Sequence, residues 1–205
     1  MWTKKIGAAV GGACLIGLGF AGGLIADDHA DGMGSDAMEA WTAYMTPGPE
    51  HAEMAKYAGK WNMASKMWFD PAAPAQESTA KVTWELIMDG RYMLEHVDGD
   101  PFEAGMPRFK GLNVTGYDNF AKRYFFGWVD NMGTGLMVGY GESKDGGKTV
   151  EYYADTPDPM TGAMTRSKSI VRHVSLDKVE FEMYSPKPDG EGWWKNFEAT
   201  YTRAK

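Results

Sequence analysis

The sequence is poor in cysteine, in histidine and in basic residues. Its 205 residues include one cysteine, Cys14, and four histidines. A single cysteine excludes an internal disulfide, and beyond Cys14 the chain has no thiol nucleophile or thiolate ligand for a metal. Acidic residues outnumber basic ones by 28 to 21, which gives a net charge of −7. An acidic surface repels nucleic acid and anionic lipid, so no nucleic-acid partner is expected.

Two signatures of common enzymes are also missing. The chain has no Gly-x-Ser-x-Gly turn, which would expose a nucleophilic serine, and no His-Glu-x-x-His, which would bind zinc. No long helical pattern separates the strand-like runs, so parallel β-α-β units are not expected. The whole chain is 43% hydrophobic and 24% charged, which is typical of a globular domain with a full core.

Residues 1–26 are predicted to be a signal peptide or an N-terminal anchor. Lys4 and Lys5 precede an uncharged run, Ile6–Ala26, and Asp27 follows it. This order is typical of a secretory signal, with cleavage after Gly23 or Ala26, although the run is also long enough to span a bilayer. A lipoprotein anchored at Cys14 is the third alternative. Each one places the domain outside the cytoplasm, periplasmic or secreted, and membrane contact is expected only through an uncleaved segment.

Residues 27–49 are predicted to be a flexible acidic linker that includes a short helix over Asp36–Met45. Pro47-Gly48-Pro49 breaks the chain, and Pro49 suits the first turn of a second short helix over 50–57. Residues 50–205 are predicted to form one domain. A helix directly before its first strand could close one end of a barrel.

About ten strand-like runs follow, separated by turn signals such as Asp89-Gly90 and Gly146-Gly147. Their predicted spans are 60–69, 77–88, 91–98, 108–117, 122–130, 135–142, 148–155, 163–174, 178–185 and 193–203. Short connections between successive strands predict an antiparallel meander. The fold class is therefore all-β, a closed up-and-down barrel of about ten strands with a short N-terminal helix.

Closure is predicted from the two ends of this array. Trp61 follows Gly59 at the start of the first strand, and Arg203 ends the last one. Strict alternation places Trp61, Met63 and Met67 on one face of the first strand, and Tyr201 and Arg203 on the same face of the last. An arginine stacked on this indole would join the first and last strands inside a closed barrel.

Several segments resemble a known family. Gly59-x-Trp61 with a terminal Arg203 resembles the calycin superfamily, which includes the lipocalins and fatty-acid-binding proteins. Six segments more closely resemble a bacterial family of domains of unknown function, number 1579: Pro47–His51, Gly116–Asn119, Trp128–Gly135, Asp158–Gly162, Phe181–Tyr184 and Thr200–Arg203. The resemblance implies a lipocalin-like barrel that is often exported. It implies no activity, cofactor or catalytic residue.

A barrel of this size is wide enough to keep a cavity, and aromatic residues are the candidates for its wall. Tyr124, Phe126 and Trp128 share a face with Asp130. Arg166 could receive an anionic head group if its strand face is the inner one; the alternative is ordinary surface charge. The predicted ligand-binding residues are Trp84, His96, Tyr117, Trp128, Tyr152 and Arg166, with Trp61 and Arg203 as the structural closure.

The metal and cofactor predictions are few, and the cofactor stays unknown. His96 shares a face with Tyr92 and Leu94 and could point inward, either as a haem ligand or as a hydrogen-bonded histidine. Cleavage after Ala26 would leave His29 third from a free amine, an arrangement that binds Cu(II) or Ni(II); the alternative is a solvated linker. Of the 15 methionines, those in or beside loops could bind Cu(I): Met132, Met137, Met160 and Met164. The alternative is that methionine fills the core or forms an adaptable apolar pocket.

Three functions remain open. The first is an extracytoplasmic protein that binds a small apolar or amphipathic molecule in its barrel. The second is an enzyme that uses the same cavity, with Asp130, His96 or Tyr117 as acid–base groups. The third is a structural or interaction domain whose barrel is filled by its own side chains. A cavity above roughly 300 Å³ would favour a ligand, and a buried carboxyl group with a shifted pKa would favour the enzyme.

Overall fold

The computed structural model describes residues 33–101, 105–158, 162–187 and 190–205. The signal peptide or anchor, its cleavage sites, Cys14 and His29 lie outside the described residues. The chain divides into two units, Met1–Met38 and Glu39–Lys205, and all ten strands belong to the second.

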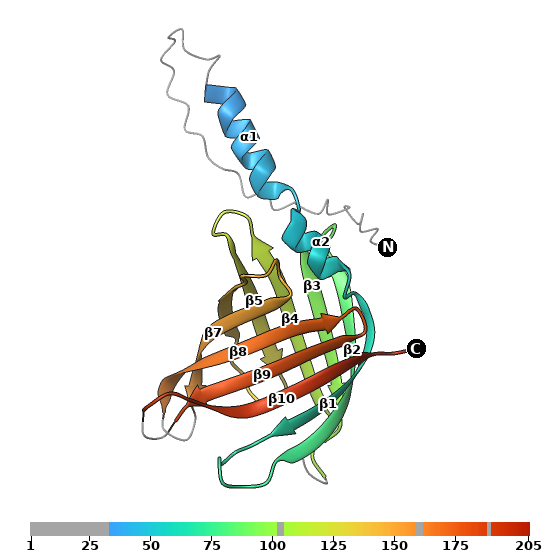
Figure 1. The fold of residues 1–205 in the computed structure, drawn as a ribbon, viewed down its shortest axis with the longest axis vertical. Coiled ribbons are helices and arrows are strands. Elements are labelled where there is room, and N and C mark those ends of the chain that lie inside the picture. The colour runs from blue at the N-terminus through green and yellow to red at the C-terminus, as the bar shows by residue number, and fades with distance from the viewer. Residues whose placement is uncertain (1–32, 102–104, 159–161, 188–189) are drawn as a thin grey trace, which may run out of the picture. The chain divides into compact units, whose positions relative to one another are not determined.

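The ten strands form one closed antiparallel barrel, as the sequence predicts (Figure 1). Each strand pairs with the next along the chain, and β10 returns to pair with β1. The strands are β1 (Gly59–Met67), β2 (Gln76–Ile87), β3 (Tyr92–Gly99), β4 (Phe109–Asp118), β5 (Arg123–Asp130), β6 (Met137–Glu142), β7 (Thr149–Asp158), β8 (Ala163–Ser175), β9 (Lys178–Pro186) and β10 (Trp193–Arg203).

The predicted spans differ from the observed ones by up to three residues. The seventh strand is the clearest case, because it continues to Asp158 rather than ending at Asp155. The additional residues Thr156–Asp158 pair with Ala163–Thr165 of β8, so the hairpin is longer than its turn residues indicate.

Trp61 and Arg203 meet at the closure of the barrel, as predicted. They are directly paired in the β1–β10 register. The guanidinium carbon lies 4.4 Å from the centroid of the indole, which is 1% exposed. Arg203 also donates to the carbonyl groups of Lys56, Ala58 and Leu176 at 2.9–3.0 Å. One side chain therefore joins the chain before β1, the turn after β8 and the end of β10.

Two helices precede the barrel, α1 (Met33–Met45) and α2 (Pro49–Ala55). They correspond to the two short helices that the sequence predicts. Pro49 occupies the first turn of α2, and the backbone N–H of Gly48 donates to Nδ1 of His51 at 3.0 Å. None of the helices in the described chain is both long and apolar enough to cross a membrane.

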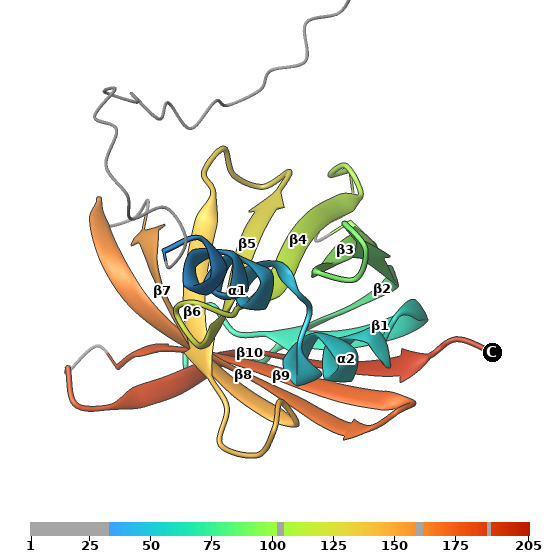
Figure 2. The same ribbon diagram turned by 90° about the horizontal axis from the view of Figure 1, so that it is seen from above.

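Helix α2 lies at one end of the barrel (Figure 2). The Asn119 side chain, in the turn between β4 and β5, donates to the carbonyl groups of Ala43, Tyr44 and Thr46 at 2.8–3.2 Å. Arg91, in the turn between β2 and β3, donates to the carbonyl of Met45 at 2.8 Å. These contacts fix the chain that enters α2 against the turns at this end.

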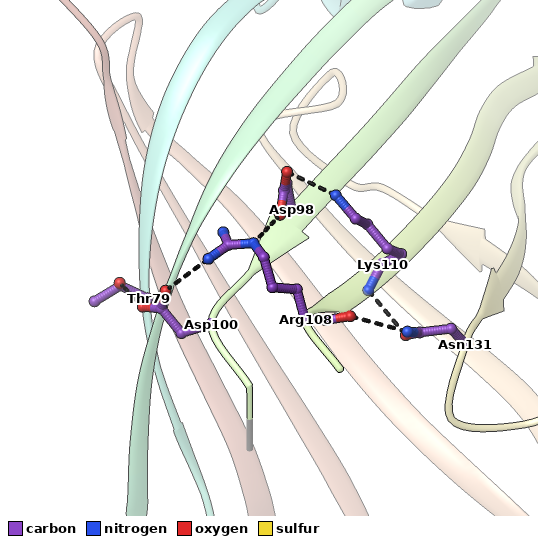
Figure 3. A network of polar contacts seen from close by, with 6 residues as sticks. All are labelled: Thr79, Asp98, Asp100, Arg108, Lys110 and Asn131. Carbon is purple, nitrogen blue, oxygen red and sulfur yellow. Dashed lines mark hydrogen bonds and ion pairs between the residues drawn. The ribbon is translucent and has the colours of Figure 1, made fainter. Parts of the chain in front are cut away.

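An exposed polar network ties together the strands at the other end (Figure 3). Arg108 donates to Asp98 at 2.9 Å and to Asp100 at 3.4 Å, and Lys110 pairs with Asp98 at 2.7 Å. Asn131 bridges the backbone of Arg108 and Lys110. The network links the ends of β3 and β5 to the start of β4.

Candidate functional site: the barrel interior

The barrel encloses a cavity of about 430 Å³. This volume lies within the range of small-molecule sites, and a barrel filled by its own side chains would leave no such space. Most of the wall is apolar and comes from the inner faces of the strands. Aromatic residues contribute Tyr57, Trp84, Phe109, Tyr124, Phe126, Trp128, Tyr152, Phe181, Phe197 and Tyr201, and methionine contributes Met54, Met63, Met67, Met93, Met132, Met137 and Met183.

One carboxyl group interrupts this apolar wall at the centre of β3. Glu95 lies between the inward-facing Met93 and Val97, and it is 9% exposed. Asn113, paired with it in the β3–β4 register, donates through Nδ2 to Glu95 Oε2 at 3.3 Å. Glu95 Oε1 and Asn113 Oδ1 are both buried and have no hydrogen-bond partner. Two buried oxygen atoms without a partner therefore belong to side chains that line the cavity.

Burial raises the pKa of the Glu95 carboxyl above its ordinary value. The indole of Trp84, the amide of Asn113 and the hydroxyl of Tyr201 each lower that pKa, but by less than burial raises it. Of these three, only Asn113 meets the geometry of a hydrogen bond. Burial therefore disfavours the ionised form of Glu95. A cationic or hydrogen-bond-donating ligand would favour that form.

The charged side chains that line the cavity are carboxylates. They include Glu50, Glu53, Glu95, Asp100 and Asp130, and no lysine or arginine is among the lining residues in the described part of the chain. Most of these acids have local partners. Lys56 pairs with Glu53 and Arg108 with Asp100, while Asp130 accepts from the Trp128 indole at 2.7 Å.

Near α2 the wall carries a cluster of ring hydroxyls and one imidazole. Tyr117 packs edge to face on Tyr124, with ring centroids 4.9 Å apart, and burial raises the pKa of Tyr124 to about 12. His173 stacks on Tyr57 at 4.1 Å and donates from Nδ1 to the carbonyl of Gly147 at 2.9 Å. Burial lowers the pKa of His173, so this imidazole is neutral and its ring is engaged in packing.

Three of the predicted ligand-binding residues line the cavity: Trp84, Trp128 and Tyr152. Asp130, a predicted acid–base group, also lines it. Tyr117 is not among the residues that line the cavity; it packs on Tyr124 and on His51 of α2.

The sequence prediction that His96 and Arg166 face the cavity is wrong, because both side chains are exposed. His96 is exposed on the outer face of β3, because Met93, Glu95 and Val97 take the inner positions. The haem ligation suggested for His96 inside the barrel therefore has no geometric basis. Arg166 is exposed on β8 beside Asp155, at 3.7 Å, because Ser167 and Ser169 take the inner positions. The alternative of ordinary surface charge holds for Arg166.

The sequence interpretation missed Glu95 and Asn113. A signal for Glu95 was present, because Met93, Glu95, Val97 and Gly99 occupy one face by alternation, and a carboxylate among apolar residues on such a face is unusual. No comparable signal marked Asn113, whose strand is rich in small and polar residues on both faces.

The described residues bear on only part of the metal predictions. In the described ranges, no group of three or more His, Cys, Asp or Glu side chains is placed to hold a metal ion. The copper or nickel site at His29 lies outside those ranges and stays a prediction.

The fold and the interior define the class of this protein as a closed, ten-stranded antiparallel β-barrel with an internal cavity. Residues 46–203 match the family described as "Protein of unknown function (DUF1579)", so the chain belongs to that family, as its segments suggested. No curated protein matches the chain.

A solved structure titled "Crystal Structure of Rv2717c from M. tuberculosis" is similar to this chain. The TM-score is 0.53 and the sequence identity 13%, over 78% of this chain and 100% of the other. At this identity the similarity concerns the fold alone.

Proposed function

We propose that this protein is an extracytoplasmic binding protein that holds a small, largely apolar molecule inside its barrel. The observation that carries the proposal is the cavity of about 430 Å³, walled by aromatic and methionine side chains with few polar groups. Sites of this size with a few directed polar groups are typical of small-molecule binding.

The extracytoplasmic location is supported by the order of residues at the N-terminus. Lys4 and Lys5, the apolar run Ile6–Ala26 and the following Asp27-Asp28 have the pattern of an export signal. Cell fractionation together with the intact mass of the native protein tests this part. A mature mass that begins near residue 27, in a periplasmic or secreted fraction, is expected; a full-length protein in the cytosol would contradict it.

Native mass spectrometry of protein purified from its own host tests binding directly, since a retained ligand adds its mass. A second test is titration with N-phenyl-1-naphthylamine, an apolar probe whose fluorescence rises when it leaves water. We expect saturable binding, and no saturable signal would contradict the proposal.

Ser169→Phe provides the variant that fills the cavity. Ser169 is buried on the inner face of β8, so the new ring would occupy ligand space and lower probe affinity by about tenfold or more. Ile170→Phe places the same ring on the outer face of the same strand and should leave probe binding unchanged. Thermal unfolding of both variants separates loss of the site from loss of the fold.

An enzymatic use of the cavity is the second candidate, and Glu95 is the observation that favours it. A buried carboxyl group with a raised pKa is a common general acid or base. The ligand recovered from native protein distinguishes the two functions. An unchanged molecule after prolonged incubation supports binding, while conversion that is lost in Glu95→Gln supports catalysis.

A further inference from the structure

We propose that the cavity selects a small organic cation, with an apolar body and one protonated amine that binds between Glu95 and Asn113. This inference rests on the proposed function and specifies its ligand class. It is drawn from the unpaired atoms of these two side chains and from the sign of the charges around the cavity.

With Glu95 ionised, the pair formed by Glu95 and Asn113 leaves two acceptor oxygens for a ligand and no amide donor. Its Nδ2 donates to Glu95 Oε2 at 3.3 Å and to Thr115 Oγ1 at 3.0 Å, so both amide hydrogens are engaged. The remaining Asn113 Oδ1 and the Glu95 Oε1 are buried and unpaired. An ammonium group brings three donors and can satisfy both oxygens of the ionised pair, whereas a ketone, an ether or a carboxylate places a further acceptor against an ionised Glu95.

The charge of the lining favours the same class. Its carboxylates are not matched by any lining lysine or arginine in the described chain. Glu53 and Asp100 have cationic partners outside the wall, but Glu95 has no ion pair among the described residues. A buried anion beside Glu95 would add repulsion to the loss of hydration, while a cation supplies the missing countercharge.

Aromatic rings next to Glu95 suit the remainder of such a ligand. Trp84 is paired with Glu95 in the β2–β3 register, and the Trp84 and Tyr201 rings lie 5.1 Å apart. An aromatic ring attracts a cation through its face and also packs against an apolar ligand body.

Binding of an amine should release protons. The groups that act on Glu95 are Trp84 of β2, Asn113 of β4 and Tyr201 of β10. Only Tyr201 is titratable, and it is neutral because burial raises its pKa. Burial raises the pKa of Glu95 and so favours its protonated form in the empty barrel, while an ammonium partner favours the ionised form. One bound amine therefore displaces up to one proton from Glu95.

Three probes of matched shape test the ligand class: 1-naphthylmethylamine, 1-naphthylmethanol and 1-naphthoate. Near pH 7 these are a cation, a neutral alcohol and an anion on the same ring system. We expect the amine to bind wild-type protein about 10- to 100-fold more tightly than the alcohol, and the naphthoate most weakly. Equal affinity for amine and alcohol, or tightest binding of the anion, would overturn the proposal.

Glu95→Gln tests the residue. The substitution keeps the shape and an oxygen for Asn113, so we expect the preference for the amine to disappear while alcohol binding stays within about threefold. Glu85→Gln is the matched control, because it makes the same change of side chain at an exposed position on the outer face of β2. An unchanged amine preference in Glu95→Gln would assign the selectivity elsewhere and overturn the role of Glu95.

Calorimetry of the wild-type protein in phosphate and in Tris gives a readout that needs no variant. The buffer takes up the released proton, so the binding heat of the amine should differ between phosphate and Tris by the number of released protons times the difference in ionisation enthalpy of the two buffers. The binding heat of the alcohol should be the same in both. No proton release with the amine contradicts the proposal. If N-phenyl-1-naphthylamine and all three probes fail to bind, the proposed function fails; if they bind without preference for the amine, only the ligand class does.

Discussion

Arg203 lies with its guanidinium 4.4 Å above the indole of Trp61, and the two residues are direct partners across β1 and β10. They are separated by most of the barrel sequence, so this contact forms only when the sheet closes. Three backbone carbonyl groups from two other segments accept from the same guanidinium. The pair therefore anchors the closure of the barrel to the helix end and to the turn after β8.

Arg203→Met should lower the free energy of unfolding by about 2–4 kcal/mol. Methionine retains part of the packing on Trp61 but leaves the carbonyl groups of Lys56, Ala58 and Leu176 without this donor. Urea denaturation followed by far-ultraviolet circular dichroism measures the change.

The control for this variant is Arg166→Met on the outer face of β8. Arg166 is exposed, 5.0 Å from the Tyr153 ring, and its loss should change stability by about 0.5 kcal/mol or less. Equal free energies of unfolding for the two variants would contradict a stabilising role of the contact between Arg203 and Trp61.

Gly59→Ala should destabilise the barrel by about 1–3 kcal/mol. Gly59 has a φ of +137°, and an added Cβ would lie 2.8 Å from a terminal nitrogen of Arg203. The substitution strains the backbone and pushes the guanidinium away from Trp61. Thermal unfolding detects the loss, with Gly133→Ala as the control, because Gly133 has open space around it and no positive φ. An unchanged melting temperature for Gly59→Ala would contradict this prediction, because it would show that the guanidinium can move without a loss of stability.

Replacement of Glu95 by glutamine should change how stability depends on pH. The folded-state pKa of Glu95 is raised above the ordinary value of 4.5, so the folded protein holds this proton more tightly than the unfolded chain. The unfolding free energy of wild type should thus fall as the pH rises from about 4.5 to the raised pKa. The variant lacks this contribution and should be the more stable one at pH 7, with little difference near pH 4. A difference that does not vary with pH would contradict the assignment.

His173 should make the folded protein less stable as the pH falls, which is the opposite pH dependence to that of Glu95. Its pKa is lowered below the ordinary value of 6.5, so the unfolded chain takes up this proton at a higher pH than the folded protein. The unfolding free energy should decrease as the pH falls below about 6.5. His173→Phe keeps the ring stacked on Tyr57 but cannot titrate, and its stability should fall less over this range. Equal slopes for both proteins in urea titrations would exclude His173 as the source.

The architecture could be predicted because each strand carries its own turn signals and alternation. Trp61 and Arg203 could be matched across the chain because both fall on the apolar face of their strands. Local patterns do not show how far a hairpin pairs before its turn, so the extension of β7 to Asp158 was missed.

The candidate site could be predicted only where side-chain type and strand face agree, as for Trp84, Trp128 and Tyr152. His96 was misplaced because both faces of its strand carry apolar residues: Tyr92 and Leu94 share its face, but Met93 and Val97 take the inner positions. Glu95 was missed because a carboxylate on an apolar face costs free energy, and residue type alone predicts that it faces solvent. Its unpaired oxygen depends on Asn113, a residue of the neighbouring strand.

The many thioether side chains of the lining bear on how strictly the barrel would discriminate. Methionine is unbranched and rotates about three bonds, so such a wall can adapt to guests of different outline at little energetic cost. Glu95 belongs instead to a strand that is paired on both sides, which fixes its backbone in place. Ligands would then be selected by the position of their charge far more than by their shape. One barrel could therefore bind a series of chemically related compounds.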